Sequence, residues 1–418
     1  MYKVILFLTF IVVSSNAQWM KTNSPEDRVF DFQQVGNYIY AGSENSGLFR
    51  SSDSGKSFMK ISTGLPISSY DILDLEYNNG ILWASLYGAA VIKSTDDGNS
   101  WTTFDSGFET QAMVLAVHAY GDSVFAAINY DIGLMPSGIY KSAISEPAWR
   151  RTSGYFPPNL NIGAFLIADD GTMYVGAAIA GSKGSLYVST NFGSDWQRKD
   201  IPGIQGVLSF TQSGDVVFAG AIGGIFSSSD TGKTWLPFGD FTTNLVFDDL
   251  LTTNGKIYAA VDPLGVAYSR LTNPEWTVIS GNLPNEDDYV SSLYQHEGKL
   301  FAALSSKNGI WVNENILSEI DEPETPVVFR VKQNYPNPFN PSTQIAYSLA
   351  KESFVTLEVY NIQGEKVESV VNAIQNTGEY NVQFDGSNLA SGIYIARLRA
   401  SSEGEIDFTK SIKMILMK

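Results

Sequence analysis

The chain has 418 residues, 44% of them apolar and 17% charged, with a net charge of −17. It contains no cysteine and two histidines, which excludes disulfides and thiolate metal sites and leaves few ligands for zinc or copper. Residues 18–326 carry 17 basic and 35 acidic side chains, whereas residues 327–418 carry nine of each. A surface of this sign repels polyanions, so we expect no nucleic-acid partner, although acidity of this kind also simply keeps a protein soluble.

The first 17 residues have the pattern of a secretory signal peptide. Lys3 precedes an apolar run over residues 4–13, and small residues follow, with Ser15 and Ala17 at the cleavage positions. The alternative is a permanent membrane anchor, but ten helical residues rise only about 15 Å, roughly half of the hydrocarbon core of a bilayer. We therefore expect export and a mature chain that begins at Gln18.

Residues 18–320 contain a repeat with a period of 39–48 residues. Four segments begin with serine and end with an aromatic residue seven positions later: 51–58 (SSDSGKSF), 94–101 (STDDGNSW), 189–196 (STNFGSDW) and 228–235 (SSDTGKTW). Degenerate copies cover 142–149 and 269–276, and a seventh begins at Asn313. Each unit contains short apolar runs of period two separated by turn residues, which is typical of four antiparallel strands. The repeat therefore predicts a seven-bladed β-propeller.

The seventh repeat lacks its closing aromatic residue, because Ile320 occupies that position. Trp19, followed by Met20 and Lys21, matches the outer strand that begins at Trp101 in the second repeat. We expect the mature N-terminus to supply the outer strand of blade seven. Such a closure leaves no open sheet edge in the ring.

The repeated SxDxGxTW pattern resembles the Asp box, or BNR repeat, of the sialidase-like propeller superfamily. That resemblance implies that each box is a hairpin turn between the third and fourth strands of a blade, on the face opposite any active site. An Asp side chain can accept hydrogen bonds from turn amides, and glycine adopts the left-handed conformation readily. We therefore assign structural roles to Asp53, Asp96, Asn191 and Asp230.

The C-terminal segment begins with an acidic, proline-bearing linker over residues 321–329. The motifs that follow within residues 330–418 are QNYPNPFNPS (333–342), LEVYNIQG (357–364), LASGIY (389–394) and KSIKMILMK (410–418). Together they resemble the type A sorting domain of the type IX secretion system. The resemblance implies a small immunoglobulin-like β-sandwich, recognised by the outer-membrane translocon and removed by a sorting peptidase. The alternating apolar strands independently favour a β-sandwich, so an ordinary adhesion or carbohydrate-binding sandwich is the alternative.

These patterns predict an all-β chain: a signal peptide at 1–17, a seven-bladed β-propeller at 18–320, a linker at 321–329 and the sorting domain at 330–418. We expect a monomer on the outer cell surface or in the medium. The sequence predicts no cofactor and no metal site. Calcium stays open, since no acidic loop has a regular ligand spacing.

A ligand site is expected on the face away from the Asp boxes, where the chain enters the innermost strands. The candidate ligand-binding residues are Tyr87, Tyr130, Asp131 and Asp288. We expect a glycan-binding or protein-binding propeller. The alternative is a glycoside hydrolase, endoglucanase-like or sialidase-like, with Asp71 and Asp248 as acid and base, although such carboxylates also commonly cap strand entries. A sialidase needs an arginine cluster, and Arg28 is the single arginine near the start of an inner strand.

Overall fold

In the computed structural model the described residues form two compact units, the first within residues 18–270 and 274–319 and the second within residues 271–273 and 320–417. The structure describes residues 18–417 except 25, 62–64, 66–70, 89–90, 109–112, 130–135, 153–155, 158–159, 180–183, 202–203, 240–244, 273, 285–287, 306–307, 315–328, 332–333, 335–336 and 403–404. The predicted signal peptide and nearly all of the predicted linker lie outside these residues. Among the residues described there are strands and turns but no helix.

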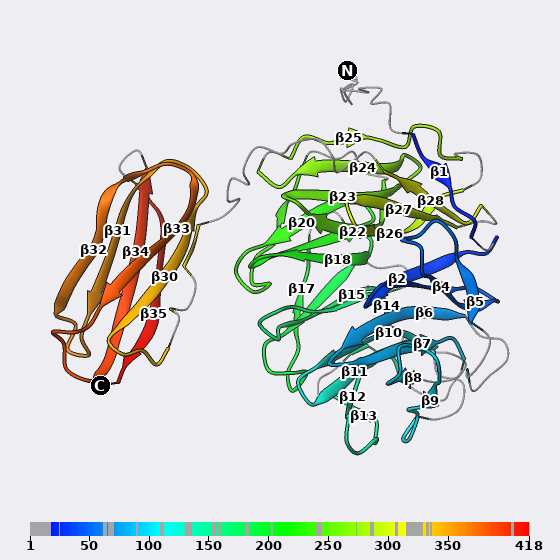
Figure 1. Cartoon of the computed structure of the whole chain (residues 1–418), viewed down its shortest axis with the longest axis horizontal. Helices are drawn as coiled ribbons and strands as arrows, with labels where there is room; N and C mark the ends of the chain where they lie inside the picture. Colours follow the sequence, from blue (N-terminus) through cyan, green and yellow to red (C-terminus); the bar gives the residue numbers. More distant parts are fainter. Residues whose placement is uncertain are drawn as a thin grey trace. The chain divides into compact units, whose positions relative to one another are not determined.

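The first unit contains seven four-stranded antiparallel sheets, which we call blades 1 to 7 (Figure 1). Blade 1 comprises β2 (Val29–Val35), β3 (Tyr38–Ser43), β4 (Gly47–Ser51) and β5 (Met59–Ile61); blade 2 comprises β6 (Ile72–Asn78), β7 (Ile81–Leu86), β8 (Val91–Ser94) and β9 (Thr102–Thr103). Blade 3 comprises β10 (Met113–Tyr120), β11 (Ser123–Asn129), β12 (Gly138–Ala143) and β13 (Arg150–Arg151); blade 4 comprises β14 (Leu160–Ile167), β15 (Met173–Ile179), β16 (Ser185–Ser189) and β17 (Gln197–Lys199). Blade 5 comprises β18 (Val207–Ser213), β19 (Val216–Ala221), β20 (Gly224–Ser228) and β21 (Leu236–Pro237). Blade 6 comprises β22 (Val246–Thr253), β23 (Lys256–Asp262), β24 (Gly265–Arg270) and β25 (Thr277–Val278).

Blade 7 joins the two ends of the propeller. It comprises β26 (Val290–His296), β27 (Lys299–Leu304), β28 (Ile310–Asn313) and β1 (Met20–Lys21), with Met20 paired to Val312. The innermost strands β2, β6, β10, β14, β18, β22 and β26 each contact the next, and β26 contacts β2. The seven sheets therefore form a closed ring, and the predicted seven-bladed propeller is confirmed.

Every innermost strand carries a β-bulge near its start. The ladder between first and second strands shifts at the same place in each blade, as between Val29 and Asp31 in blade 1 and between Phe247 and Asp249 in blade 6. Equivalent shifts occur in the other five blades. A bulge turns one extra residue out of the ladder and re-aims its neighbours. The seven bulges therefore form a ring at one end of the propeller.

The core between neighbouring blades is made of alternating apolar side chains. Trp83 and Tyr140, for example, belong to one cluster shared by blades 2 and 3, and Trp149, the closing aromatic residue of the third repeat, packs into the same cluster. The second strand of each blade is buried on both faces, which matches its continuous apolar sequence.

The second unit is a two-sheet sandwich, as predicted. One sheet has the order β29-β30-β33 and the other the order β32-β31-β34-β35. Their bounds are β29 (Arg330–Val331), β30 (Ser342–Leu349), β31 (Ser353–Tyr360), β32 (Lys366–Gln375), β33 (Gly378–Asp385), β34 (Gly392–Ser402) and β35 (Glu405–Leu416). Inward-facing residues such as Ile345, Leu357 and Leu398 are fully buried between the sheets.

Candidate functional site

In the four well-formed serine-to-aromatic turns, the polar side chains form hydrogen bonds within the turn itself. In the first, the Ser51 hydroxyl donates to Asp53 Oδ1 over 2.8 Å and accepts the Gly55 amide over 2.9 Å, and the Ser57 amide donates to Asp53 Oδ1 over 2.9 Å. Asp96 and Asp230 make the same bonds, and Asn191 does so with Asp195 in place of a hydroxyl residue. The Ser100 hydroxyl and amide lower the pKa of Asp96 to about 2. These side chains serve the turns.

The order of antiparallel strands divides the propeller into two ends. Each serine-to-aromatic turn joins the third strand of a blade to the fourth, and these turns mark the turn end. The connections between second and third strands, and those entering each innermost strand, lie at the opposite end, which we call the loop end. The bulges lie near the loop end, because they occur in the first residues of the innermost strands.

At the loop end, four residues from blades 1, 6 and 7 approach one another; we call Arg28, Asp248, Asp262 and Tyr289 the Arg28 cluster. The Arg28 guanidinium lies 4.6 Å from the centre of the Phe30 ring and 5.6 Å from that of Tyr289. Its buried Nε has no hydrogen-bond partner among the described residues. Asp248 is the bulge residue of β22, and Asp262 ends the neighbouring strand β23.

These surroundings raise the pKa of the Asp248 carboxyl group toward neutral pH. Burial and the nearby Asp262 raise the pKa of Asp248 to about 6, although Arg28 acts in the opposite direction. Such a group exchanges a proton readily near neutral pH and both donates and accepts hydrogen bonds. The Arg28 cluster therefore offers a cation, two carboxyl groups and an aromatic ring at one place.

The other candidate acid, Asp71, is used differently. Its Oδ1 accepts the backbone amide of Asn45 over 2.9 Å, and its carbonyl accepts the Tyr87 amide over 3.0 Å. Asp71 thus caps the loop between β3 and β4 in blade 1. It lies at the start of blade 2, whereas Asp248 lies in blade 6, so blades 7 and 1 stand between them in the ring. These contacts favour a structural role for Asp71.

The candidate ligand-binding residues fall into three groups. The Tyr87 side chain is 42% exposed and lies at a β-bridge with Met113. Asp288 accepts hydrogen bonds from the Ser305 hydroxyl and the Asn308 amide group, both over 2.8 Å, and so orders the loop after β27. Tyr130 and Asp131 lie outside the described residues.

Three carboxylates on the innermost strands were not predicted from the sequence. Asp31, Asp74 and Asp249 each follow a bulge, and the Oδ2 atom of each accepts a hydrogen bond of 2.7–2.8 Å from a backbone amide in the innermost strand of the next blade. The donors are Leu75 to Asp31, Val117 to Asp74 and Leu293 to Asp249. Burial raises the pKa of all three, that of Asp31 well above its usual range and those of Asp74 and Asp249 to about 6. The signal was the position of each acid, two residues after the buried apolar residue that precedes the bulge, which is Val29, Ile72 or Phe247.

A histidine links three blades beside this group. His118 on β10 lies 3.5 Å from Glu76 Oε2 on β6, and its Nε2 lies 3.1 Å from the Phe165 carbonyl oxygen on β14. Burial lowers the pKa of His118, but the hydrogen bond to Glu76 and the charges of Glu76 and Asp74 outweigh it and raise the pKa to about 9. His118 is therefore a cationic bridge between neighbouring blades.

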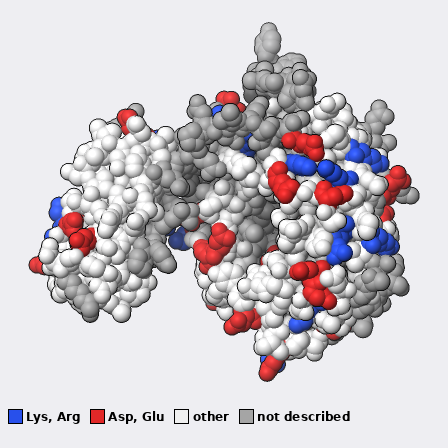
Figure 2. All heavy atoms as spheres, viewed as in Figure 1, with Lys and Arg blue, Asp and Glu red and all other residues white. Residues whose placement is uncertain are grey.

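Within the described ranges, no group of three or more His, Cys, Asp or Glu side chains is arranged to hold a metal ion. The buried carboxylates are directed at backbone amides, and the Arg28 cluster contains two carboxyl groups. Figure 2 shows acidic and basic side chains interspersed over the visible face of the propeller. The net negative charge is thus not gathered into one patch on that face.

Residues 333–413 match the family model described as the secretion system C-terminal sorting domain. This segment covers β30 to β34 and most of β35, so it includes strands of both sheets of the second unit. The second unit is a type IX secretion sorting domain. The sorting domain directs the protein across the outer membrane, and the chain is exported to the cell surface or the extracellular space. None of the curated proteins matches the sequence.

The propeller is similar in fold to solved structures of low sequence identity. A structure titled YCF48 bound to D1 peptide has a TM-score of 0.58 at 14% identity, over 75% of this chain and 99% of that one. YCF48 from Cyanidioschyzon merolae gives 0.55 at 10% identity, over 71% and 98%. The extracellular domain of the putative hybrid two-component system BT4673 from B. thetaiotaomicron gives 0.54 at 12% identity. That alignment covers 97% of this chain but only 58% of the solved one. These likenesses show the propeller fold.

No helix in the described part of the chain is long and apolar enough to cross a membrane. The balanced charge of residues 327–418, nine basic and nine acidic, coincides with the sorting domain, and the acidic excess lies before it.

Proposed function

We propose that the propeller is an extracellular glycan-binding domain and that it takes its ligand at the loop end, around the Arg28 cluster. The observation that supports this is the approach of Arg28, Asp248, Asp262 and Tyr289 from three blades. A guanidinium, two carboxyl groups and an aromatic ring are the groups that bind sugar hydroxyls and the apolar face of a sugar ring.

The distribution of exposed apolar side chains favours a glycan over a protein partner. A protein interface has an apolar core, whereas the exposed large apolar residues described in the propeller are spread over five blades. They are Met20, Met59, Tyr77, Tyr87, Phe192 and Leu236. A peptide ligand is the competing outcome, since one structure of similar fold carries a D1 peptide.

The test is a glycan-array screen of the mature chain, followed by calorimetry on the glycans that bind. We expect Asp248→Asn and Arg28→Gln to weaken binding at least about tenfold, since each removes a charge-assisted hydrogen bond. Asp122→Asn is the matched control, because Asp122 is exposed in the turn between β10 and β11 at the turn end. Equal affinity of all three variants would place the ligand elsewhere.

Glycoside hydrolysis is the second candidate, and the pKa of Asp248 near 6 favours it. A general acid of this kind needs a second carboxylate about 5 to 10 Å away, and Asp262 is the neighbour that raises the pKa of Asp248. A polysaccharide screen for new reducing ends tests the idea. Loss of product in Asp248→Ala with full activity in Asp71→Ala would support hydrolysis at the Arg28 cluster; unchanged product in Asp248→Ala would reject it.

A further inference from the structure

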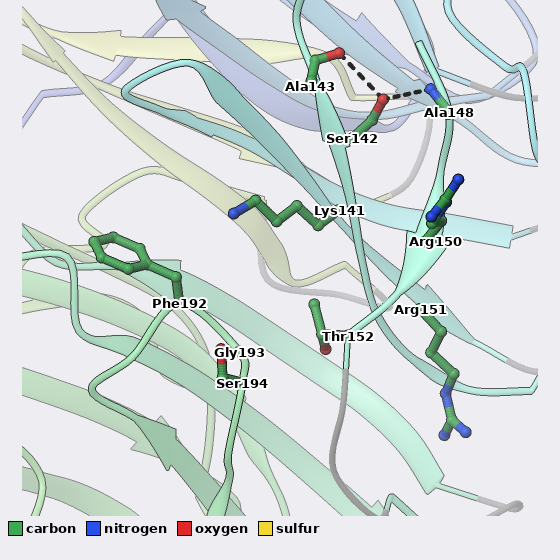
Figure 3. Close-up of a pocket in the computed structure, with 10 residues that line it drawn as sticks. All are labelled: Lys141, Ser142, Ala143, Ala148, Arg150, Arg151, Thr152, Phe192, Gly193 and Ser194. Atoms are coloured by element: carbon green, nitrogen blue, oxygen red, sulfur yellow. Dashed lines mark hydrogen bonds between the residues drawn. The ribbon is translucent and has the colours of Figure 1, made fainter. Parts of the chain in front are cut away.

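A cavity at the turn end lies between blades 3 and 4. It has a volume of about 350 Å³ and is lined by β12, β13 and the turn that follows β16. Lys141, Arg150 and Arg151 contribute three cations, and Phe192 contributes an aromatic ring. Figure 3 shows the Lys141 side chain extending toward Phe192, with Thr152 and Ser194 beside the space between them. A cavity of this size can hold one or two sugar rings.

The lining of the cavity is cationic although the chain is acidic. Its ten lining residues include three cations and no carboxylate. Lys141 lies directly opposite Arg150 in the ladder between β12 and β13. Like charges at opposed positions of a sheet repel each other, so this arrangement is unfavourable in the free protein. A bound anion would relieve the repulsion.

The equivalent pair in the six other blades contains at most one cation. The pairs are Arg50 with Met59, Lys93 with Thr102, Val188 with Gln197, Ser227 with Leu236, Tyr268 with Thr277 and Val312 with Met20. The double cation is therefore a property of blade 3 and not of the repeat.

No ion pair within the described residues neutralises these cations. Lys141 Nζ lies 5.3 Å from the centre of the Phe125 ring, and the Arg151 guanidinium donates to the Ser137 carbonyl over 2.7 Å. The nearest acid of the adjoining turn, Asp195, already accepts the Asn191 amide group over 3.0 Å. Figure 3 shows the Arg151 guanidinium directed away from Lys141 and Phe192. Figure 3 also shows Lys141 and Arg150 leaving their strands in different directions, so Lys141 is the cation that lies beside Phe192, and Arg150 adds positive charge at the rim of the cavity.

Phe192 is a second and independent sign of a ligand. It has a φ of +55° and its side chain is 44% exposed. Ser54, Asp97 and Thr231 occupy this left-handed position in the three other well-formed turns, and all are small or polar. A bulky residue is disfavoured in that conformation, and an exposed ring loses contact with the core. The Phe192 ring rests against Tyr120, with centroids 5.5 Å apart, and leaves a surface toward the cavity.

We propose that this cavity binds an acidic sugar, in which Lys141 holds the carboxylate or sulfate, Arg150 adds to the positive charge that attracts it, and Phe192 stacks on the sugar ring. A cation beside an aromatic face matches a ligand that carries an anionic group on a ring with an apolar face. The hydroxyl of Thr152, which also lines the cavity, donates to the Ile139 carbonyl over 2.9 Å, and its oxygen can still accept a hydrogen bond from a ring hydroxyl. An acidic peptide satisfies the charges but gives Phe192 no sugar-like partner.

The site is at the opposite end of the propeller from the Arg28 cluster, so an experiment can reject either proposal without rejecting the other. The experiment is calorimetry on the mature full chain with a galacturonic acid trisaccharide, a sulfated galactose trisaccharide, a neutral galactose trisaccharide and a hexaglutamate peptide. We expect at least one acidic sugar to bind, the neutral sugar to bind at least about tenfold more weakly, and added salt to weaken binding. Binding of none of them, or equal binding of the peptide, overturns the proposal.

Variants locate the ligand. Lys141→Gln with Arg150→Gln, and separately Phe192→Ala, are expected to weaken acidic-sugar binding at least about tenfold. Lys93→Gln is the matched control, because Lys93 has the equivalent position in blade 2 and also lies over an aromatic ring. A Lys93→Gln effect as large as that of the Lys141 and Arg150 variant would contradict the site.

Arg150→Glu separates binding from folding. It places a carboxylate opposite Lys141, so we expect a higher melting temperature of the free protein together with loss of acidic-sugar binding. A variant that keeps wild-type affinity overturns the proposal. A melting temperature that is unchanged or lower contradicts the repulsion between Lys141 and Arg150 on which it depends.

Discussion

Aspartate side chains have opposite properties at the two ends of the propeller. Asp96 is exposed in a turn, and hydrogen bonds from Ser100 lower its pKa to about 2. Asp249 follows a bulge, where burial raises its pKa to about 6 although it accepts two amides. The turn carboxylate is therefore ionised at any ordinary pH, whereas Asp249 titrates in a mildly acidic range.

The raised pKa of Asp249 has a consequence for stability. A carboxyl group with a raised pKa binds its proton more tightly in the folded state than in the unfolded chain. The stability that the protonated Asp249 carboxyl group contributes is fully present below pH 3.8, the ordinary pKa of an Asp side chain. It is lost as the pH rises to about 6. Because Asp249→Asn does not titrate, the unfolding free energy of wild type relative to this variant should fall between about pH 4 and 6. Urea unfolding at several pH values measures it.

Asp122→Asn, which removes an exposed turn carboxylate, is the control and should follow the wild-type pH dependence. A parallel pH profile for wild type and Asp249→Asn would mean that the Asp249 carboxyl group titrates normally in the folded protein.

At the scale of elements, one two-residue strand closes the whole ring. β1 pairs with β28. The adjacent Trp19 side chain is 1% exposed, and its indole N–H donates a hydrogen bond of 2.8 Å to the Ile279 carbonyl. The Asn282 side chain holds the Trp19 backbone at both its amide and its carbonyl. The N-terminus is thus fixed by its side chain and its backbone together.

Trp19→Ala should destabilise the propeller by about 3 to 5 kcal/mol, since it empties a buried site and orphans the Ile279 carbonyl. Met20→Ala is the matched control from the same strand, because Met20 is 47% exposed, and it should cost under about 1 kcal/mol. Thermal and urea unfolding of both variants measures the difference. Similar losses for the two variants would show that ring closure depends on the strand pairing and not on the indole.

At the scale of the molecule, the export signal and the two proposed ligand sites lie in separate units. Residues 333–413 match the sorting domain, whereas the Arg28 cluster and the blade 3 to blade 4 cavity lie in the propeller. The sandwich has its own core of fully buried residues, among them Val355, Leu357 and Phe384. Such a core lets the sorting domain fold independently of the blades.

Deleting residues 327–418 should leave a folded propeller that accumulates in the periplasm. Fractionation of cells and medium with an antibody to the propeller measures this, and circular dichroism of the purified truncated chain checks its folding. Secretion of the truncated chain at the wild-type level would show that residues 327–418 are not needed for export.

Sequence alone determined the number of blades, the closure by Trp19 and the sorting domain, because each depends on local patterns that repeat or match within short segments. It also named Asp248 and placed it at an inner-strand entry. It did not find the pairing of Arg28 with Tyr289, the amide contacts of Asp31, Asp74 and Asp249, or the cavity of Lys141, Arg150 and Phe192. Those depend on contacts between blades and on the bulges that aim the side chains, so only the closed ring brings their members together.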